Sequence, residues 1–128
     1  MEVEKASATG TADDLAALTL LMNALQRFNQ FDPKMQVSTV LTLLEIAAAE
    51  QADREISVQD IERRVGLKSG TASRNCYYWA EGHKDMTGGY EMIRIDFDQN
   101  DRRKRSLTLT NKGRAFIRNL GSGLKRGD

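Results

Sequence analysis

The chain has 128 residues, of which 40% are hydrophobic and 29% charged, and these values are ordinary for one soluble globular domain. No apolar run approaches the length of a membrane span, and the acidic start MEVEK does not resemble a secretory signal. The single cysteine excludes an internal disulfide. We therefore expect a cytoplasmic protein that does not associate with a membrane.

The net charge of +1 conceals an uneven distribution along the chain. Residues 1–62 carry 4 Lys/Arg against 11 Asp/Glu, a net charge of −7, whereas residues 63–128 carry 15 against 7, a net charge of +8. A basic half can present a local anion-binding face in a protein that is neutral as a whole. The acidic half can equally neutralise it in the fold, so charge alone leaves both interpretations open.

The first residues predict an arm followed by a long helix. Residues 1–11 are small and polar, without periodicity, and predict a flexible arm. From Asp13 to about Phe31, apolar residues recur at helical spacing along two stripes. Two stripes predict burial on two sides, so we expect residues 12–31, together with a C-terminal helix over residues 111–120, to form the contact of a homodimer. The stripes consist of Leu15, Leu18, Met22 and Leu25, and of Leu21, Leu25 and Phe28.

Three further helices are predicted before residue 81. The second helix is expected from Val37 to Glu50, and the third from Val58 to Val65. Ser57 and Asp60 have the spacing of a capping box, and Gly66 is suited to end the third helix. The fourth helix is expected over residues 69–80. The residues expected to face inward are Val40, Leu41, Leu44, Ala47 and Ala48 in the second helix, and Ala72, Cys76 and Trp79 in the fourth.

The remaining sequence predicts a hairpin and a last helix. YEMIRIDF and SLTLT alternate in the manner of strands on either side of the charged turn QNDRRK. Thr110 or Asn111 then begins a helix over 111–120, which Gly121 ends, and residues 121–128 form a flexible tail. Two short helices joined by a tight turn and followed by a hairpin are typical of a winged helix-turn-helix. We expect one such domain, mainly α with a β-hairpin wing, over residues 12–120.

The stretch VGLKSGTASRNCYYW permits two interpretations. Lys68-Ser69-Gly70-Thr71 could be a glycine-rich phosphate loop, but such a loop has Gly directly before Lys and follows a strand. Here Leu67 precedes the lysine, and the residues before it are helical in pattern. The stretch is therefore predicted to be a turn that leads into a helix.

The fourth helix has the composition of a recognition helix. Side chains that form hydrogen bonds gather near its start, where such a helix enters the major groove of DNA. Arginine can bind guanine and asparagine can bind adenine, each through two hydrogen bonds. The alternative is a solvated surface helix. The candidate DNA contacts are Lys68, Ser69, Gly70, Thr71, Ser73, Arg74, Asn75 and Tyr77.

The hairpin turn concentrates positive charge. Residues 98–106 would form the tip of a wing, where a guanidinium can enter a narrow minor groove. The alternative is an exposed turn whose charges only protect a sheet edge. The candidate contacts here are Asp101, Arg102, Arg103, Lys104 and Arg105.

The segment DRRKRSLTLTNKG, residues 101–113, resembles the wing signature of MarR-type winged-helix transcription regulators. In that family an Asp-x-Arg precedes Leu-Thr-x-x-Gly at a set distance. The resemblance covers roughly residues 37–120 and implies that Arg103 enters the minor groove while Asp101 orients it. It also implies effector pockets beneath long terminal helices. Because the C-terminal helix is expected to be short here, we do not expect a small-molecule effector.

Other chemistry has little support in the sequence. His83 is the only histidine, so a metal site would need an unusual set of carboxylates, and we expect neither a metal nor a cofactor. No arrangement of catalytic residues suggests an enzyme. Cys76 is predicted to be a buried small hydrophobe, with a redox sensor as the alternative.

We therefore expect a homodimeric, sequence-specific regulator that binds double-stranded DNA and represses transcription. Residues 69–80 would read the major groove and residues 98–106 the minor groove. The alternative is a winged-helix module that binds an acidic protein surface.

Overall fold

The computed structural model describes residues 2–83, 88–101 and 103–126, with side chains described from residue 12 to residue 124 within those ranges. The chain divides into two compact units. One comprises residues 1–35 and 118–128, and the other comprises residues 36–117. The sequence predicted one domain over residues 12–120. The division into two units arises because the terminal helices pack on each other.

The first unit consists of α1 (Glu2–Asn29) and the end of α5 (Asn111–Arg126). The Arg27 guanidinium donates a hydrogen bond to the Asn119 side-chain oxygen, and Phe28 and Leu120 are buried. Both helices are longer than the sequence predicted. The helix α1 begins at Glu2 rather than after an arm, and α5 continues through Gly121 instead of ending there. A helical glycine costs only about 1 kcal/mol, which packing against a neighbouring helix can offset.

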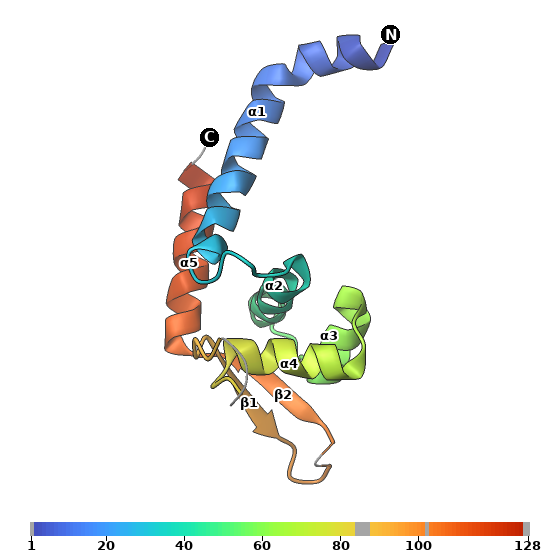
Figure 1. The fold of residues 1–128 in the computed structure, drawn as a ribbon, viewed down its shortest axis with the longest axis vertical. Helices are drawn as coiled ribbons and strands as arrows, with labels where there is room; N and C mark the ends of the chain where they lie inside the picture. The colour runs from blue at the N-terminus through green and yellow to red at the C-terminus, as the bar shows by residue number, and fades with distance from the viewer. Residues whose placement is uncertain (1, 84–87, 102, 127–128) are drawn as a thin grey trace. The chain divides into compact units, whose positions relative to one another are not determined.

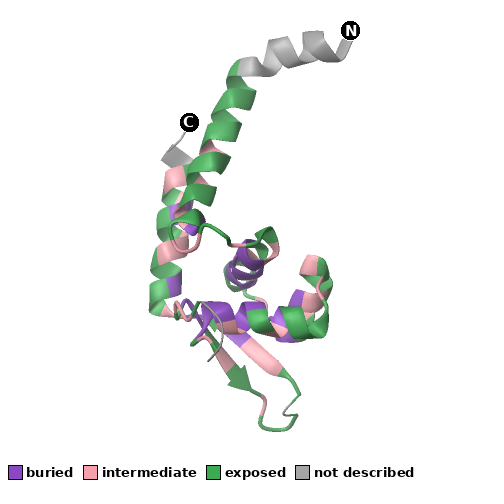
Figure 2. Cartoon of the chain, in the orientation of Figure 1, coloured by how far each residue is buried: buried purple, intermediate pink, exposed green. Residues whose placement is uncertain are grey.

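The core of the second unit lies between α2 (Val37–Gln51) and α4 (Ser69–Trp79). Both helices, labelled in Figure 1, carry many buried residues, drawn in purple in Figure 2. The prediction for α4 is confirmed. The prediction for α2 is partly wrong, because Leu41 and Ala48 are exposed and Leu44 is half-buried. Apolar residues surround much of α2, so periodicity could not select the buried face. That face carries Val40, Leu43, Ile46, Ala47 and Ala49.

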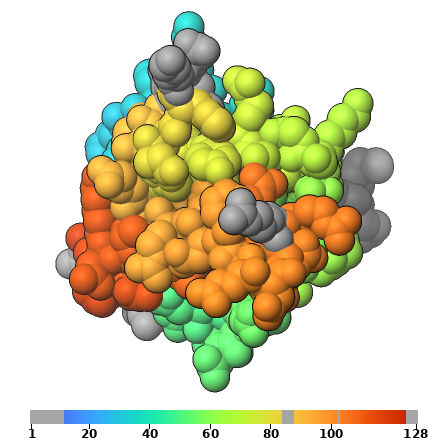
Figure 3. Space-filling model, turned by 90° about the horizontal axis from the view of Figure 1, so that it is seen from below, coloured from blue at the N-terminus to red at the C-terminus, as the bar shows by residue number. Residues whose placement is uncertain are grey.

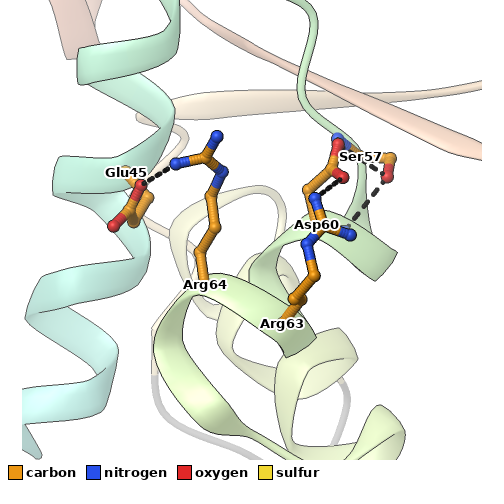
Figure 4. A network of polar contacts seen from close by, with 5 residues as sticks. All are labelled: Glu45, Ser57, Asp60, Arg63 and Arg64. Atoms are coloured by element: carbon orange, nitrogen blue, oxygen red, sulfur yellow. Dashed lines mark hydrogen bonds and ion pairs between the residues drawn. The ribbon is translucent and has the colours of Figure 1, made fainter.

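In the sequence, α3 (Val58–Ile61) lies between α2 and α4 and continues into a π-helical turn, η1 (Glu62–Gly66). The predicted capping box is present, since Asp60 N–H donates to Ser57 Oγ and Ser57 N–H donates to Asp60 Oδ2. Gly66 has a φ of +85°, as expected for the residue that ends the helix. Around this cap, Arg63 bonds Asp60 at 2.8 Å, and Arg64 lies 3.7 Å from Glu45 of α2 (Figure 4).

The wing is a two-stranded antiparallel hairpin of β1 (Ile93–Phe97) and β2 (Arg105–Leu109). Ile93 pairs with Leu109 and Phe97 with Arg105, so the predicted hairpin is confirmed. On its other edge β2 meets the segment before α3, where Leu107 N–H donates to Ile56 O at 2.9 Å. This bond fixes the base of the hairpin to the core.

The start of α5 explains why the chain has Thr-x-x-Gly there. The Thr110 hydroxyl donates to the Glu91 carbonyl at 2.7 Å and accepts from Gly113 N–H at 3.0 Å. A Cβ atom on Gly113 would overlap the Met92 carbonyl oxygen. Threonine thus caps the helix, and glycine lets the helix approach the chain that enters β1.

Within the described residues, no helix combines the length and the apolar character that crossing a membrane requires.

Candidate nucleic-acid interface

The turn before α4 presents the start of that helix to solvent. Gly66 ends the preceding turn in a left-handed conformation, and Lys68 is extended at the N-cap without capping α4 through its side chain. No acidic residue lies in α4. The N–H groups of its first turn, with the partial positive charge of a helix start, suit an anion such as a phosphate. The four predicted contacts in this turn, Lys68, Ser69, Gly70 and Thr71, are all exposed.

Further along α4 the predicted contacts separate into different environments. Arg74 is exposed, three residues beyond Thr71 and therefore on the same side of the helix. Ser73 and Tyr77 are half-buried, and the Tyr77 ring lies 4.5 Å from the ring of His83. The exposed polar side of α4 is consequently formed by Thr71 and Arg74 together with the residues at its start.

Asn75 requires a correction. We predicted a base contact, but its side chain is 8% exposed and faces α2. Its amide oxygen accepts from the Thr39 hydroxyl at 3.3 Å, and its amide nitrogen donates to Thr42 Oγ1 at 3.4 Å. A buried amide must find partners inside the protein, and two threonines of α2 supply them. Asn75 is therefore not available to a base in this conformation.

The hairpin tip is ordered by carboxylates. The Asp98 side chain accepts from the backbone N–H groups of Asn100 and Asp101, at 2.8 and 3.3 Å. The Asp101 side chain then accepts from Arg103 twice, from its backbone N–H at 3.1 Å and from Nε at 3.2 Å. The Arg103 side chain is nevertheless 89% exposed. The turn thus holds a guanidinium in a defined position in solvent. Arg102 lies outside the described residues.

The two predicted elements meet where β2 begins, next to the hairpin turn. Arg105 is half-buried, and its Nη1 donates to Ser73 Oγ of α4 at 3.0 Å. These residues were both predicted to contact DNA, and the structure joins them by a hydrogen bond. Lys104 remains exposed beside them. Figure 3 views the face on which the hairpin (orange) and α4 (yellow) lie next to each other.

Several notable residues of this unit were not predicted from the sequence. Arg63 lies in the helix-turn-helix turn with its side chain 69% exposed, although two consecutive arginines before Gly66 were a visible signal. Phe97 is 57% exposed on the hairpin, opposite Arg105. Thr39 and Thr42 gave no signal, because threonines in an apolar helix do not reveal their distant partners.

The described part of the chain contains no candidate metal-binding site. There, no group of three or more His, Cys, Asp or Glu side chains is arranged to hold an ion. The only cysteine, Cys76, is buried.

Solved structures with a similar fold exist, although no protein-family model and no curated protein matches the sequence. YusO of Bacillus subtilis has a TM-score of 0.65 at 13% identity, over 98% of this chain and 79% of that one. A mutant of S. aureus MepR has a TM-score of 0.67 at 18% identity, over 92% and 76%. The chain shares the winged helix-turn-helix fold of these structures.

A third structure with this fold comes with a stated activity. BpsR of Bordetella bronchiseptica has a TM-score of 0.52 at 21% identity, over 87% of this chain and 80% of that one. Its structure was reported for the mechanism by which 6-hydroxynicotinic acid regulates DNA binding by BpsR. At these identities the likeness concerns the fold alone.

Proposed function

We propose that the protein is a homodimeric transcription regulator that binds double-stranded DNA sequence-specifically. The helix α4 lies in the major groove and the hairpin in the adjacent minor groove. The observation that carries the proposal is the combination, on one unit, of an exposed polar side of α4 and an exposed, positioned arginine at the hairpin tip. Both belong to a fold found in a protein with regulated DNA binding.

The exposed side of α4 fits base recognition. Arg74 can form two hydrogen bonds to guanine, and the Thr71 methyl group can contact a thymine methyl. Lys68 and the uncapped amides at the helix start suit the phosphates that flank the groove. The helix therefore has both base-reading and phosphate-binding groups at the end that enters a groove in this class of domain.

The hairpin tip fits the minor groove. Because Asp101 holds Arg103 through its side chain and backbone, less conformational entropy is lost when the guanidinium binds. A narrow minor groove has an enhanced negative potential that attracts arginine. Lys104 adds a second exposed cation to the same turn.

Dimerisation is proposed through α1. Its large apolar side chains Leu15, Leu18, Leu21, Met22 and Leu25 are all exposed. A contiguous apolar side on a helix is typical of a protein contact. A symmetric dimer would place two copies of α4 on two half-sites, as winged-helix and related dimers do. We further propose that binding represses transcription, since a dimer on a promoter blocks access to it.

The proposal is tested by selecting bound sequences from a random pool of double-stranded DNA. The selected site and a scrambled site are then titrated at about 50 and 200 mM salt. We expect tighter binding to the selected site, and affinities for both sites that fall steeply with salt. An absence of DNA binding at the lower salt would overturn the proposal. It would favour the alternative, in which the same basic face binds an acidic protein surface.

A further inference from the structure

The most unexpected feature of α4 is a buried polar contact at its centre. Asn75 is 8% exposed and Thr39 is 6% exposed, while Thr42 is fully buried. The Asn75 amide bonds both threonines, and the Trp79 indole N–H donates to the Thr39 carbonyl at 2.7 Å. We call these residues, Thr39, Thr42, Asn75 and Trp79, the polar clamp. It joins two turns of α4 to the first half of α2.

The bonds of the polar clamp form one consistent chain of donors and acceptors. The Thr42 hydroxyl donates to the Ser38 carbonyl at 2.8 Å, so its oxygen is left to accept from the Asn75 amide nitrogen. The Asn75 oxygen accepts from the Thr39 hydroxyl. Among the described side chains, no buried polar atom lacks a partner. Sliding α4 along α2 would break several of these hydrogen bonds at once. Each buried polar group left without a partner would then lower the free energy of unfolding.

The rest of the contact between these helices cannot fix their register in this way. The other side chains that these helices bury are mostly apolar, among them Leu43, Ile46, Ala72 and Cys76. Apolar packing is non-directional, and similar shapes can interdigitate in neighbouring positions. Buried polar residues are known to select one register among several in helical assemblies.

We propose that the polar clamp sets the position of α4 on α2 and thereby where Thr71 and Arg74 meet the bases. The proposal rests on the proposed function. Asn75 acts here as a positioning residue and does not contact a base itself. On another side of α4, Ser73 is bonded to Arg105 of the hairpin. The helix is therefore held to α2 through Asn75 and to the hairpin through Ser73, and Arg74 between them remains exposed.

The sharpest test changes α2 and leaves α4 intact. Thr39→Val and Thr42→Val are isosteric substitutions that remove one hydroxyl each from the polar clamp. Ser38→Ala is the matched control, because Ser38 joins the clamp only through its backbone carbonyl. Each variant is titrated on the selected site, on a scrambled site and on every single base-pair substitution of the selected site. Folded fractions are measured under the same conditions.

We expect each valine variant to lower the ratio of selected-site to scrambled-site affinity by about threefold to tenfold. The loss should be spread over all base pairs that α4 reads, while the salt dependence and the base pairs read by the hairpin stay unchanged. Asn75→Ala should produce the same profile, and combining it with Thr42→Val should add little. Ser38→Ala should match the wild type.

Two results would overturn the proposal. If the valine variants bind all sites with wild-type affinity and Asn75→Ala loses sequence preference at a single base pair, Asn75 reads that base directly. If all affinities fall together with the folded fraction, the polar clamp only stabilises the protein.

A measurement without DNA separates this inference from the proposed function. Nitroxide labels on Leu41→Cys and Arg74→Cys, both exposed positions, report the distance between α2 and α4. The buried Cys76 does not compete for the label. Thr42→Val should broaden that distance distribution even if the wild type prefers no DNA sequence. An unchanged distribution would refute the clamp whatever the DNA titrations show.

Discussion

Burial determines the chemistry of Cys76. The side chain is fully buried in α4, and burial raises the pKa of its thiol to about 12, against the opposing effect of the positive charge of Arg105. Oxidation proceeds through the thiolate, which is scarce at neutral pH when the pKa is this high. The interpretation of Cys76 as a structural residue therefore has physical support that the redox-sensor alternative lacks.

The raised pKa of Cys76 gives stability a defined pH dependence. The folded state favours the neutral thiol, whereas the unfolded thiol titrates near its ordinary pKa of 9.0. The contribution is fully present below pH 9 and is lost as pH rises from 9 towards 12, by about 1.4 kcal/mol per pH unit. Urea denaturation of the wild type and Cys76→Ala should differ by a constant amount below pH 8 and by a shrinking amount above pH 9.

Thiol labelling provides the control for this prediction. A thiol reagent at pH 8 should modify Cys76 only as fast as the protein unfolds. Fast labelling of the folded protein, accompanied by loss of DNA binding, would instead support a sensor.

The contact between Asp101 and Arg103 predicts a graded pair of substitutions. Arg103→Ala removes an exposed cation from the hairpin tip, so affinity should fall on selected and scrambled DNA alike. The log–log salt slope should also decrease in magnitude by about one. Asp101→Ala leaves the charge but frees the arginine, so we expect a smaller loss, about twofold to fivefold, with an unchanged salt slope. Full wild-type affinity in Arg103→Ala would show that the hairpin is only a solvated turn.

Asn75 illustrates what the sequence could not resolve at the scale of a residue. Its type and its place in α4 were compatible with a base reader. Its actual partners, Thr39 and Thr42, lie on another helix more than thirty positions earlier. By contrast, the bond between Asp101 and Arg103 spans two positions, and the wing motif indicated it. Local contacts could be predicted, whereas contacts between helices could not.

The start of α5 shows how one position can decide whether an element fits. Alanine normally stabilises a helix relative to glycine by about 1 kcal/mol. Gly113→Ala should do the opposite and destabilise the protein by about 1–3 kcal/mol, since its Cβ would overlap the Met92 carbonyl. Gly121→Ala in the same helix meets no neighbour within 4 Å and should stabilise slightly. Urea denaturation of both variants measures the contrast, and equal stability changes would contradict it.

At the scale of elements, local signals predicted most of the fold. The capping box of Ser57 and Asp60, the left-handed Gly66 and the hairpin all arise within short stretches of sequence. The buried side of α2 was mistaken because apolar residues lie on more than one side of that helix. The start of α1 and the end of α5 were also placed too far inward. Helix ends depend on what the helix packs against, and sequence periodicity does not contain that information.

At the scale of the whole molecule, α1 carries two sides with different roles. One side, with Leu20, Ala24 and Arg27, lines a hollow of about 390 Å³ shared with Leu120 and Leu124 of α5. The other side consists of the exposed stripe around Leu18 and Met22. The side facing α5 is occupied within the chain, so the exposed stripe is the side available to a second copy.

This division predicts the effect of charge on assembly. Leu18→Glu with Met22→Glu places four carboxylates at the contact of a symmetric dimer and should dissociate it. Both positions are more than half exposed, so the fold of each chain should be retained. Sedimentation should report a monomer, and circular dichroism should match the wild type. Ala16→Glu is the control, because this exposed residue of α1 is not three or four positions from any residue of the stripe, and its substitution should leave the dimer intact.

The dimer prediction extends to the DNA. A wild-type dimer should prefer a palindromic site whose half-site centres lie about one helical turn apart, because each copy of α4 then meets an equivalent major groove. The monomeric variant should bind one half-site as well as it binds two, since nothing links the two binding events. Its affinity for the full site should therefore fall far more than its affinity for an isolated half-site. If the variant is monomeric and still prefers the palindrome as strongly as the wild type, α1 is not the element that joins the two copies on DNA.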